Sequence, residues 1–564
     1  MIVEEFTQAI VKAVQTFGID TPEVTLEHPA DFAHGDYSTN VALRYAKELK
    51  MKPRELAEKI LERLNLSADL RLSLEKTEIA GAGFINFHLT SQFFQEQVAE
   101  IHKIGNSFGK NSTRNGQRIF FEHTQPNPFK EFHIGHLMNN AIGESVSRIL
   151  AWSGAEVTRA TYHGDVGLHV AKAVWGMRQK EPHDTRYTIH DIGEAYKAGS
   201  EAYETDGAVK EEIIAINRKI YERSDPKINA LYEAGKKISL ALFEALYERL
   251  GITFYFHFFE SEAGDIGIRI VEENIGKIFE QSNQAVVYRG EKHGLHTRVF
   301  LTAEGLPTYE AKEVGLARQK KEAAQFDSAI TVTANEQNDF FRVVEKAIGE
   351  VFPKYTGKMR HLSHGMLRLP SGKMSSRTGT VISAESLIAQ VKELVQQKIK
   401  QRDMTSEEKE KLAEIVAIGA IKYSILRQAI GGDIIFDFEK SVSFEGDSGP
   451  YLQYSYVRAK SVLEKATSRE VQPQVGKEVE PRREVTILER LLYRFPEVVA
   501  RAGEELEPHY VMTYLTELAG AFNSWYANNQ IIGSGALEPY RLALTQAFAT
   551  VMRNGLFLLG ISVP

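Results

Sequence analysis

The sequence predicts a multidomain α/β protein with a small α+β N-terminal segment, a doubly wound parallel sheet in the middle and an all-α C-terminal region. The chain has 564 residues, of which 43% are hydrophobic and 25% charged, and this length suits three or four domains of roughly 100–200 residues each. Strand-like and helical segments alternate in the middle of the chain, whereas apolar residues recur at helical spacing after Glu385. The alternation favours a parallel sheet with helices on its faces, and the spacing favours a helical region.

The first hundred residues indicate a small unit of helices and strands. Apolar residues recur at helical spacing in residues 6–14 and 53–64. The segment Phe84–Phe87 follows a Gly-Ala-Gly turn, which favours a strand. The polar, glycine-bearing stretch 105–116 then predicts a linker.

The doubly wound sheet is predicted from residue 118 onward. Residues 118–122 have the pattern of a strand, two prolines mark a loop, and residues 136–150 have helical periodicity. A second strand is expected at 156–165, which completes the repeating unit of a parallel sheet. The remaining expected segments are a charged helical insertion at 177–250, strands at 285–290, 296–302 and 328–335, and a polar loop at 466–485 within the helical C-terminal region.

The composition excludes several kinds of chemistry. The chain has no cysteine, so disulfides, thiolate zinc sites, iron–sulfur clusters and a cysteine nucleophile are ruled out. The formal net charge of -7 argues against a uniformly basic nucleic-acid-binding surface but not against a local basic groove. The first residues are amphipathic and acidic, unlike a cationic leader, and no stretch approaches the ~18 apolar residues of a membrane span. A cytoplasmic location is therefore expected.

One short segment whose residues suit binding or catalysis is His133-Ile134-Gly135-His136, where a loop becomes a helix. A helix start offers free N–H groups to an anion, two imidazoles three residues apart can donate to one phosphate, and glycine lets a nucleotide approach the backbone. A capping or surface histidine pair is an equally good interpretation of these four residues alone. A metal site is less favoured, because no carboxylate or third histidine follows at helical spacing.

A second such segment is LPSGKMSSR at residues 369–377, a polar glycine-bearing loop with two cations beside two hydroxyls. A loop of this kind can close over a triphosphate and neutralise the charge that develops on a leaving pyrophosphate. Taken alone, the segment is better interpreted as a solvated turn.

Together, the two segments resemble the HIGH and KMSKS signatures of the class I aminoacyl-tRNA synthetases, and the surrounding sequence resembles the arginyl-tRNA synthetases. Similar segments follow one another along nearly the whole chain; they are AHGDYSTNVAL, GAGFINFHL, EHTQPNPFKEFHIGHL, GLPTYEAKE, HGMLRLPSGKMSSRTG, FEGDSGPYLQYSYVRA, RFPEVVARAGEELEPH and NGLFLLGI. The implied domains are an N-terminal tRNA-elbow-binding domain at 1–112, a Rossmann-like catalytic domain at 113–384 with its helical insertion, and an anticodon-binding domain at 385–564.

The resemblance also implies the reaction. ATP would activate L-arginine as arginyl-adenylate, the arginyl group would pass to the 2′-hydroxyl of the terminal adenosine of tRNA(Arg), and AMP and pyrophosphate would be released. Mg²⁺ would arrive with ATP, and no protein metal cluster is expected because none of the 17 histidines lies in an HExxH pattern. A monomer is expected on the same resemblance.

The family's phosphate-binding residues match positions of this chain. By resemblance, His133 and His136 would contact the ATP phosphates, Gly135 would make room for the nucleotide, and Lys130 would lie near the phosphates. The chain has both this lysine and the first lysine of the KMSKS-like loop but a serine in place of the second, so the sequence leaves open which cation dominates. The loop residues that would bind ATP and steady the pyrophosphate are Lys373, Met374, Ser375, Ser376 and Arg377.

Arginine recognition makes its own physical demand. A guanidinium is planar with five donors, so carboxylates and carbonyl-type acceptors bind it best. By resemblance, Glu260 and Glu313 would face the guanidinium, and Glu313 stands where relatives commonly have Asp. Any one of these carboxylates taken alone would be interpreted as a surface charge. The other residues expected to line the pocket or orient the α-amino and carboxylate ends are Glu122, Asn127, Tyr309 and Gln337.

Contacts with tRNA are expected from both ends of the chain. Tyr451, Tyr454 and Arg458 fall at i, i+3 and i+7 of a predicted helix, where they share one face. Such a face suits stacking of unpaired anticodon bases and a phosphate contact, whereas without the resemblance an aromatic core stripe would be favoured. Further candidates are Tyr526 at the anticodon end and Phe84 and Asn86 at the tRNA elbow.

Three alternatives compete with this interpretation. A small-molecule nucleotidyltransferase shares the histidine motif but has no need of a long helical C-terminal region. A non-catalytic tRNA-binding paralogue is disfavoured because the proposed catalytic and arginine-pocket residues are present. Another class I specificity is the nearest competitor; however, the cysteinyl type needs thiolate zinc ligands, and the chain has no large editing insertion.

Overall fold

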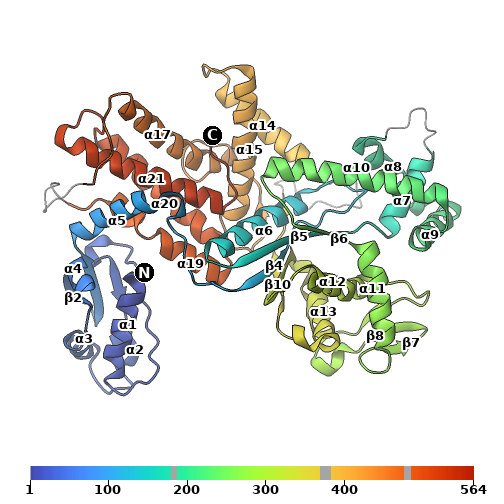
Figure 1. Cartoon of the computed structure of the whole chain (residues 1–564), viewed down its shortest axis with the longest axis horizontal. Helices are drawn as coiled ribbons and strands as arrows, with labels where there is room; N and C mark the ends of the chain where they lie inside the picture. The colour runs from blue at the N-terminus through green and yellow to red at the C-terminus, as the bar shows by residue number, and fades with distance from the viewer. Residues whose placement is uncertain (1, 180–186, 369–382, 476–483) are drawn as a thin grey trace. The chain divides into compact units, whose positions relative to one another are not determined.

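The computed structural model describes residues 2–179, 187–368, 383–475 and 484–564, and Figure 1 shows the elements along the chain. The chain forms two compact units, each assembled from separate segments. Unit 1 comprises residues 1–110, 454–501 and 514–555, and unit 2 comprises residues 111–453, 502–513 and 556–564. Among the described helices, none is both long enough and apolar enough to cross a membrane.

A five-stranded parallel sheet forms the centre of unit 2 (Figure 1). In the middle, β4 (Arg118–Glu122) pairs with β10 (Ser328–Ala334) on one side and with β5 (Glu156–His163) on the other. The outer strands are β11 (Met359–His364) beside β10 and β6 (Phe256–Phe259) beside β5. Because the strand order reverses next to β4, the predicted doubly wound sheet is confirmed, and its switch point lies between β4 and β10.

Helices cover this sheet and bury its apolar side chains. Helices α11 (Glu260–Glu273) and α12 (Tyr309–Ala323) pack so closely that a side chain at Gly267 or Gly315 would meet the backbone of the opposite helix. The core between these helices and the sheet includes Phe120, Phe258 and Phe300, all buried. The helices that follow the strands are α6 (Ile134–Trp152), α7 (Leu168–Gln179), α11 (Glu260–Glu273), α12 (Tyr309–Ala323) and α13 (Asn338–Val351).

The predicted helical insertion is present and has its own apolar cluster. Val174 of α7 packs there with Ile192, Ile216 and Tyr232, all buried. The insertion consists of α8 (Ile189–Thr205), α9 (Gly207–Glu222) and α10 (Pro226–Leu250).

Two strands expected from the sequence lie outside the central sheet. The segments predicted at 285–290 and 296–302 form a separate antiparallel sheet, because short connections allow only antiparallel pairing of neighbouring strands. This sheet consists of β7 (Glu280–Ser282), β8 (Ala285–Tyr288) and β9 (Arg298–Leu301). The remaining elements of unit 2 are β12 (Leu367–Arg368), β13 (Ile434–Ile435), α14 (Ala384–Ile399), α15 (Ser406–Leu426) and α16 (Phe438–Ser441).

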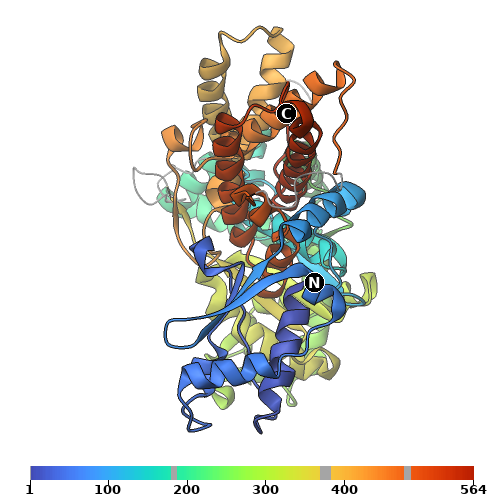
Figure 2. The ribbon, with the colours of Figure 1, turned by 90° about the vertical axis from the view of Figure 1, so that its left-hand side faces the viewer.

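The N-terminal part of unit 1 is an antiparallel sheet with helices (Figure 2). Its core includes Phe6, Leu56 and Phe87, which are fully buried. The strands are β1 (Tyr37–Thr39), β2 (Leu74–Ala80) and β3 (Phe84–Leu89), with β3 in the middle. The helices are α1 (Ile2–Gln15), α2 (Val41–Tyr45), α3 (Pro53–Glu62), α4 (Ala68–Ser73) and α5 (Ser91–Ile104).

The C-terminal part of unit 1 is helical, as predicted, and shares a core with the N-terminal part. Tyr493 packs against Phe93 and Phe94, and Arg490 forms an ion pair with the fully buried Asp36. The rings of Phe522 and Phe548 stack 3.8 Å apart. The helices of the C-terminal region are α17 (Gly449–Thr467), α18 (Ile487–Leu492), α19 (Phe495–Glu505), α20 (His509–Asn528) and α21 (Glu538–Leu558).

Candidate active site

The carboxyl ends of the parallel strands in unit 2 bring several of the predicted residues to one edge of the sheet. Glu122 is the last residue of β4, Glu260 directly follows β6, and Gln337 lies three residues after β10. Gly164 directly follows β5. In doubly wound sheets this edge, next to the switch point, is where ligands bind.

The loop between β4 and α6 has an unusual backbone that is held in place by buried groups. Thr124, Gln125 and Phe129 have φ angles of 79°, 50° and 65°. Residues other than glycine rarely adopt this left-handed region of the backbone. The Thr124 N–H donates to Asn139 Oδ1 at 2.7 Å, and the Phe129 N–H donates to Ser239 Oγ at 3.0 Å. These bonds fix the loop that carries Asn127 and Lys130.

The two histidines of the motif cap the start of α6 and fix each other's tautomer. His133 Nδ1 accepts from the N–H of Gly135 at 3.1 Å and of His136 at 3.4 Å, and His136 Nδ1 accepts from the His133 N–H at 3.3 Å. Because both Nδ1 atoms accept, the proton of each neutral ring is on Nε2. Their rings stack 3.6 Å apart. The pair therefore offers two Nε2–H donors beside a helix start.

Both rings are neutral at pH 7. Burial, with the nearby charge of Lys130, lowers the pKa of His133 to about 4. Burial also holds the pKa of His136 well below its ordinary value, with further contributions from His133 and Lys130. Lys130 itself is half-buried, its pKa is lowered by burial and by Lys172, and its ammonium lies 5.6 Å from the Tyr196 ring. This side of the site thus combines neutral donors, the α6 dipole and one cation.

Gly135 has a second reason to be glycine. A side chain there would approach Cε1 and Nδ1 of His133 to 3.0 Å, closer than carbon atoms normally come. The glycine therefore leaves the His133 ring in its capping position, in addition to any room that it leaves for a nucleotide.

A buried acid–lysine pair lies at the end of β6. Glu260 Oε2 accepts from Lys312 Nζ at 2.6 Å, and both residues are buried. Burial raises the pKa of Glu260, whereas Glu260 and Tyr221 outweigh burial at Lys312 and raise the pKa of the ammonium. A side chain at Gly164 would meet Asn127 Oδ1 and would come within 3.0 Å of Glu260 Oε1. Asn127 and Glu260 therefore approach the same point beside β5.

A second acid–lysine pair lies at the end of β4. Glu122 Oε2 is 2.8 Å from Lys320 Nζ, and both side chains are almost completely buried. Glu122 Oε1 accepts from Gln125 at 2.5 Å. Burial and the negative charge of Glu122 raise the pKa of Glu313 to about 8, against the opposing effect of Lys320. The sheet edge thus holds three carboxyl groups, of which Glu313 is mostly protonated at neutral pH.

Two buried groups support this acidic pocket. Asp165 accepts from the N–H and hydroxyl of Ser261 at 2.9 and 2.7 Å and pairs with Lys236 at 2.7 Å, which fixes the start of α11 just after Glu260. The buried hydroxyl of Tyr162 has no hydrogen-bond partner among the described residues. Burial raises its pKa well above the ordinary value, and the charges of Glu260, Glu313 and Glu122 raise it further. An unpaired buried hydroxyl among acids is suited to a polar ligand.

Other predicted residues lie at the rim of the site or outside the described part of the chain. Tyr309 is 64% exposed at the first position of α12, with its ring 5.1 Å from the Lys312 ammonium. Gln337 is exposed. The residues of the predicted KMSKS-like loop lie outside the described residues; they are Lys373, Met374, Ser375, Ser376 and Arg377.

Known families match three consecutive parts of the chain. The family described as "tRNA synthetases class I (R), catalytic domain" matches residues 97–438, which is more than half of the chain. The chain belongs to the class I arginyl-tRNA synthetases. The "Arginyl tRNA synthetase N terminal domain" family matches residues 1–89, and the "DALR anticodon binding domain" family matches residues 452–564.

Individual proteins agree with this family assignment. The chain is 30% identical to an arginine–tRNA ligase of Streptococcus thermophilus over 98% of each chain, and 28% identical to one of Clostridium perfringens over 97% of this chain and 96% of that protein. In fold it is similar to the Thermus thermophilus arginyl-tRNA synthetase, with a TM-score of 0.78, 24% identity and complete coverage of both chains. It is also similar to the Plasmodium falciparum enzyme, with a TM-score of 0.79 and 19% identity over 100% and 98% of the two chains.

In the region that matches the anticodon-binding family, α17 and α20 form an aromatic–arginine cluster. The guanidinium carbon of Arg458 lies 4.8 Å from the Tyr454 ring and 5.2 Å from the Tyr526 ring. Arg458 also donates to Asn523, which in turn donates to Ser455 Oγ at 2.8 Å. Tyr526 is 38% exposed. The structure thus brings Tyr454, Arg458 and Tyr526 together, and Tyr451 lies one turn earlier on α17.

The two residues predicted to meet the tRNA elbow have different environments on β3. Phe84 is 43% exposed, which is unusual for a phenylalanine and suits stacking on a base. Asn86 is 2% exposed, and its Oδ1 accepts from Ser38 Oγ at 2.7 Å. Of the two predicted residues, Phe84 is therefore the one that a partner can contact.

Sequence reasoning missed Lys312, Lys320 and Gly164. Lys312 lies within the matched segment GLPTYEAKE, between Tyr309 and Glu313, so its position was a signal. Lys320 follows Glu313 by seven residues on α12 and therefore lies on the same helix face. No sequence signal distinguished Gly164, because its closeness to Asn127 and Glu260 depends on the pairing of strands.

Proposed function

We propose that the chain is an arginine–tRNA ligase whose amino-acid pocket is the acidic cluster of Glu122, Glu260 and Glu313. Membership of the arginyl-tRNA synthetase family supports the reaction. The observation that supports the site is that three carboxyl groups converge at the carboxyl edge of a parallel sheet, in the same unit as two neutral Nε2–H donors. The carboxyl groups suit a guanidinium, which donates hydrogen bonds, and the Nε2–H groups suit a phosphate, which accepts them.

In the activation step, a carboxylate oxygen of arginine attacks the α-phosphorus of ATP. The bond from the α-phosphorus to its bridging oxygen breaks, and the bridging oxygen leaves with pyrophosphate. His133 and His136 are proposed to donate from Nε2 to phosphate oxygens, and Lys130 is proposed to offset their negative charge. Since both imidazoles are already neutral donors, they need no change of protonation during the step.

In the arginine pocket, the guanidinium is proposed to bind Glu260 and Glu313. Glu260 is paired with Lys312 in the free protein, so the guanidinium shares or replaces that ammonium. Asn127 and Glu122 are proposed to bind the α-amino end, with Tyr309 and Gln337 at the rim. The Tyr162 hydroxyl, which has no described partner, is free to contact the substrate.

In the transfer step, the 2′-hydroxyl of the terminal adenosine of tRNA(Arg) attacks the carbonyl carbon of arginyl-adenylate. The mixed anhydride bond breaks, and the hydroxyl proton passes to a phosphate oxygen of the departing AMP. We propose that Tyr451, Tyr454, Arg458 and Tyr526 contact the anticodon, because a guanidinium between two partly exposed tyrosines provides both stacking surface and positive charge.

Magnesium is proposed to enter with ATP, bound to its phosphates. Among the described residues, no three acids or histidines are placed to hold a metal ion, so no step is assigned to a metal site of the protein. We also propose a monomer in the cytoplasm with domains at 1–112, 113–384 and 385–564; light scattering and limited proteolysis test the mass and the boundaries.

The decisive experiment charges total tRNA with each of the twenty labelled amino acids in turn. Arginine alone should be incorporated, and only when ATP is present. Glu260→Gln should lose charging at low arginine concentration, whereas Glu262→Gln, a change at an exposed acid on the same helix, should not. Incorporation of another amino acid, or equal activity of both variants, would contradict the proposal.

A further inference from the structure

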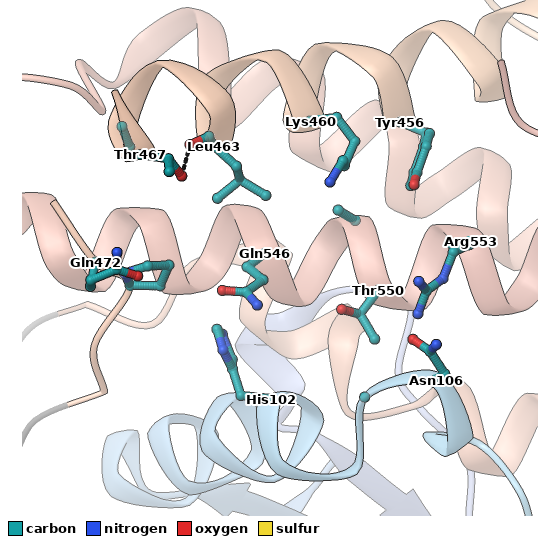
Figure 3. Close-up of a pocket in the computed structure, with 14 residues that line it drawn as sticks. His102, Asn106, Tyr456, Lys460, Leu463, Thr467, Gln472, Gln546, Thr550 and Arg553 are labelled. Atoms are coloured by element: carbon teal, nitrogen blue, oxygen red, sulfur yellow. Dashed lines mark hydrogen bonds between the residues drawn. The ribbon is translucent and has the colours of Figure 1, made fainter. Parts of the chain in front are cut away.

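Unit 1 contains a polar cavity of about 380 Å³ that has no part in the proposed reaction (Figure 3). It lies between the end of α5 and the helices α17 and α21. Ligand pockets typically have volumes of roughly 300–1,000 Å³, so the cavity suits a small molecule.

The lining of the cavity is cationic. Lys460 of α17 and Arg553 of α21 point into it (Figure 3), and no aspartate or glutamate is among the residues that line it. Within the described part of the chain, neither cation takes part in an ion pair. Lys460 is exposed and Arg553 is half-buried, so water can reach both, and their two like charges make the cavity favourable for an anion.

Neutral polar groups surround these two cations. Gln546 and Thr550 precede Arg553 along α21 by seven and three residues, and Asn106 lies opposite them just after the end of α5 (Figure 3). An amide, a hydroxyl, a guanidinium and an ammonium together provide many donors for one compact anion. A phosphate group, with several acceptor oxygens, uses such a set better than a carboxylate does.

The walls of the cavity are already in place without a ligand. Asn554 Nδ2 donates to the carbonyls of Gly105 and Phe108 at 3.1 and 3.0 Å, which fixes the end of α5 on α21. His102 Nε2 donates to the Ala543 carbonyl at 2.9 Å. Binding therefore needs little ordering of the protein.

The cavity lies on a different side of α17 from the aromatic–arginine cluster. Lys460 follows Arg458 by two residues, which turns its side chain about 200° around the helix axis. Lys460, Leu463 and Thr467 all line the cavity, whereas Tyr454 and Arg458 meet Tyr526. A tRNA anticodon bound at that cluster would leave the cavity free for another ligand.

We propose that this cavity is a binding site for a small phosphate-bearing molecule. Lys460 and Arg553 bind its phosphate group, and Gln546, Thr550 and Asn106 bind the remaining oxygen atoms. The site is separate from the ATP site and takes a phosphomonoester or inorganic phosphate.

The test is calorimetric titration of the full-length protein with inorganic phosphate and with ribose 5-phosphate. A non-hydrolysable arginyl-adenylate analogue is present at saturation, so that the catalytic site is filled. One binding site per chain is expected. Lys460→Gln and Arg553→Gln should each weaken it about tenfold or more, as expected for loss of a charge-assisted hydrogen bond.

Matched controls are Lys465→Gln on α17 and Arg541→Gln on α21, which alter cations outside the cavity. Both should keep full phosphate affinity, and all four variants should charge tRNA within about twofold of the parent rate. Equal loss in the controls, or no saturable binding to the parent protein, would overturn the proposal.

A backbone phosphate of tRNA is the other source of the same chemistry. In that case Lys460→Gln and Arg553→Gln would weaken tRNA binding and each reduce its salt dependence by about one counterion. Such a result without saturable binding of free phosphate would overturn the assignment to a small molecule; unchanged tRNA binding would support it.

Discussion

At the start of α6, His133 and His136 are neutral and present N–H donors, whereas at the ends of β4 and β6 each buried glutamate already holds a lysine. The histidine side needs no counter-ion before a phosphate arrives, because its positive potential comes from dipoles and from one lysine. The acidic side does need a counter-ion, because burying a carboxylate without a partner of opposite charge costs too much free energy.

If the histidines form the ATP site and the acids form the arginine site, as proposed, the two substrates meet different barriers. ATP adds acceptors to donors that are already oriented. At the proposed arginine site, arginine competes with Lys312 for Glu260 and displaces the proton of Glu313. Arginine binding is therefore expected to respond strongly to charge and pH, and phosphate binding much less.

The largest effect should come from Glu260→Gln. The change removes a carboxylate proposed to bind the guanidinium and leaves the Lys312 ammonium unpaired beside it, and truncating one partner of a buried charge pair weakens binding by about 2–5 kcal/mol. The KM for arginine should rise about 100-fold or more, while the KM for ATP changes by less than threefold. Steady-state charging kinetics with arginine and ATP varied separately measure both. A rise in the ATP KM equal to that for arginine would abolish the distinction between the two sides.

On the phosphate side, His136→Asn should lower the rate of arginyl-adenylate formation about 100-fold, the usual cost of one lost donor at a developing negative charge. Pyrophosphate exchange in the presence of tRNA measures this rate. The arginine KM should change by less than threefold. His190→Asn, at a largely exposed histidine on α8, is the control and should have no effect.

The next-largest effect should be a difference in pH dependence between arginine binding and ATP binding. Glu313 has a pKa of about 8 in the free protein, and a bound cation favours its ionised form, so arginine binding below pH 8 releases a proton. Arginine affinity should therefore rise with pH by up to about tenfold per unit and level off above pH 8. Glu313→Gln should remove this slope. The ATP KM should stay flat from pH 6 to 8, because the His133 pKa of about 4 lies below that range.

The smallest effects should come from a pair of glycine variants. Gly164→Ala would press on Asn127 and Glu260, so the arginine KM should rise about tenfold, the cost of modest overpacking. Gly135→Ala would press on the His133 ring and should slow adenylate formation by about threefold to tenfold. Each variant should leave the other parameter unchanged, and crossed effects would show that the two sides are coupled.

Local patterns were enough to predict much of the fold. Residues 118–122 and 328–335 were expected to be strands because of their apolar β-branched and aromatic runs, and both are found in the central sheet. The helix after the histidine motif was equally clear from its periodicity. In contrast, β6 and β11 were not predicted, because FHFF and MRHLSH are short and mixed in polarity. The separate sheet of β7, β8 and β9 was also missed, because the residue pattern of a strand does not specify which other strand it pairs with.

By itself, the sequence determined the family resemblance, the parallel sheet and the residues that were candidates for the site, because these depend on residue type and spacing along the chain. Only the tertiary structure decided which charges meet. The Lys312–Glu260 and Lys320–Glu122 pairs join α12 to the ends of two different strands, and the charge of Glu122, which adds to burial in raising the Glu313 pKa, comes from a residue far away in sequence. Charge interactions, burial and hydrogen bonds depend on distances between atoms in space, and these distances are established only when the chain folds.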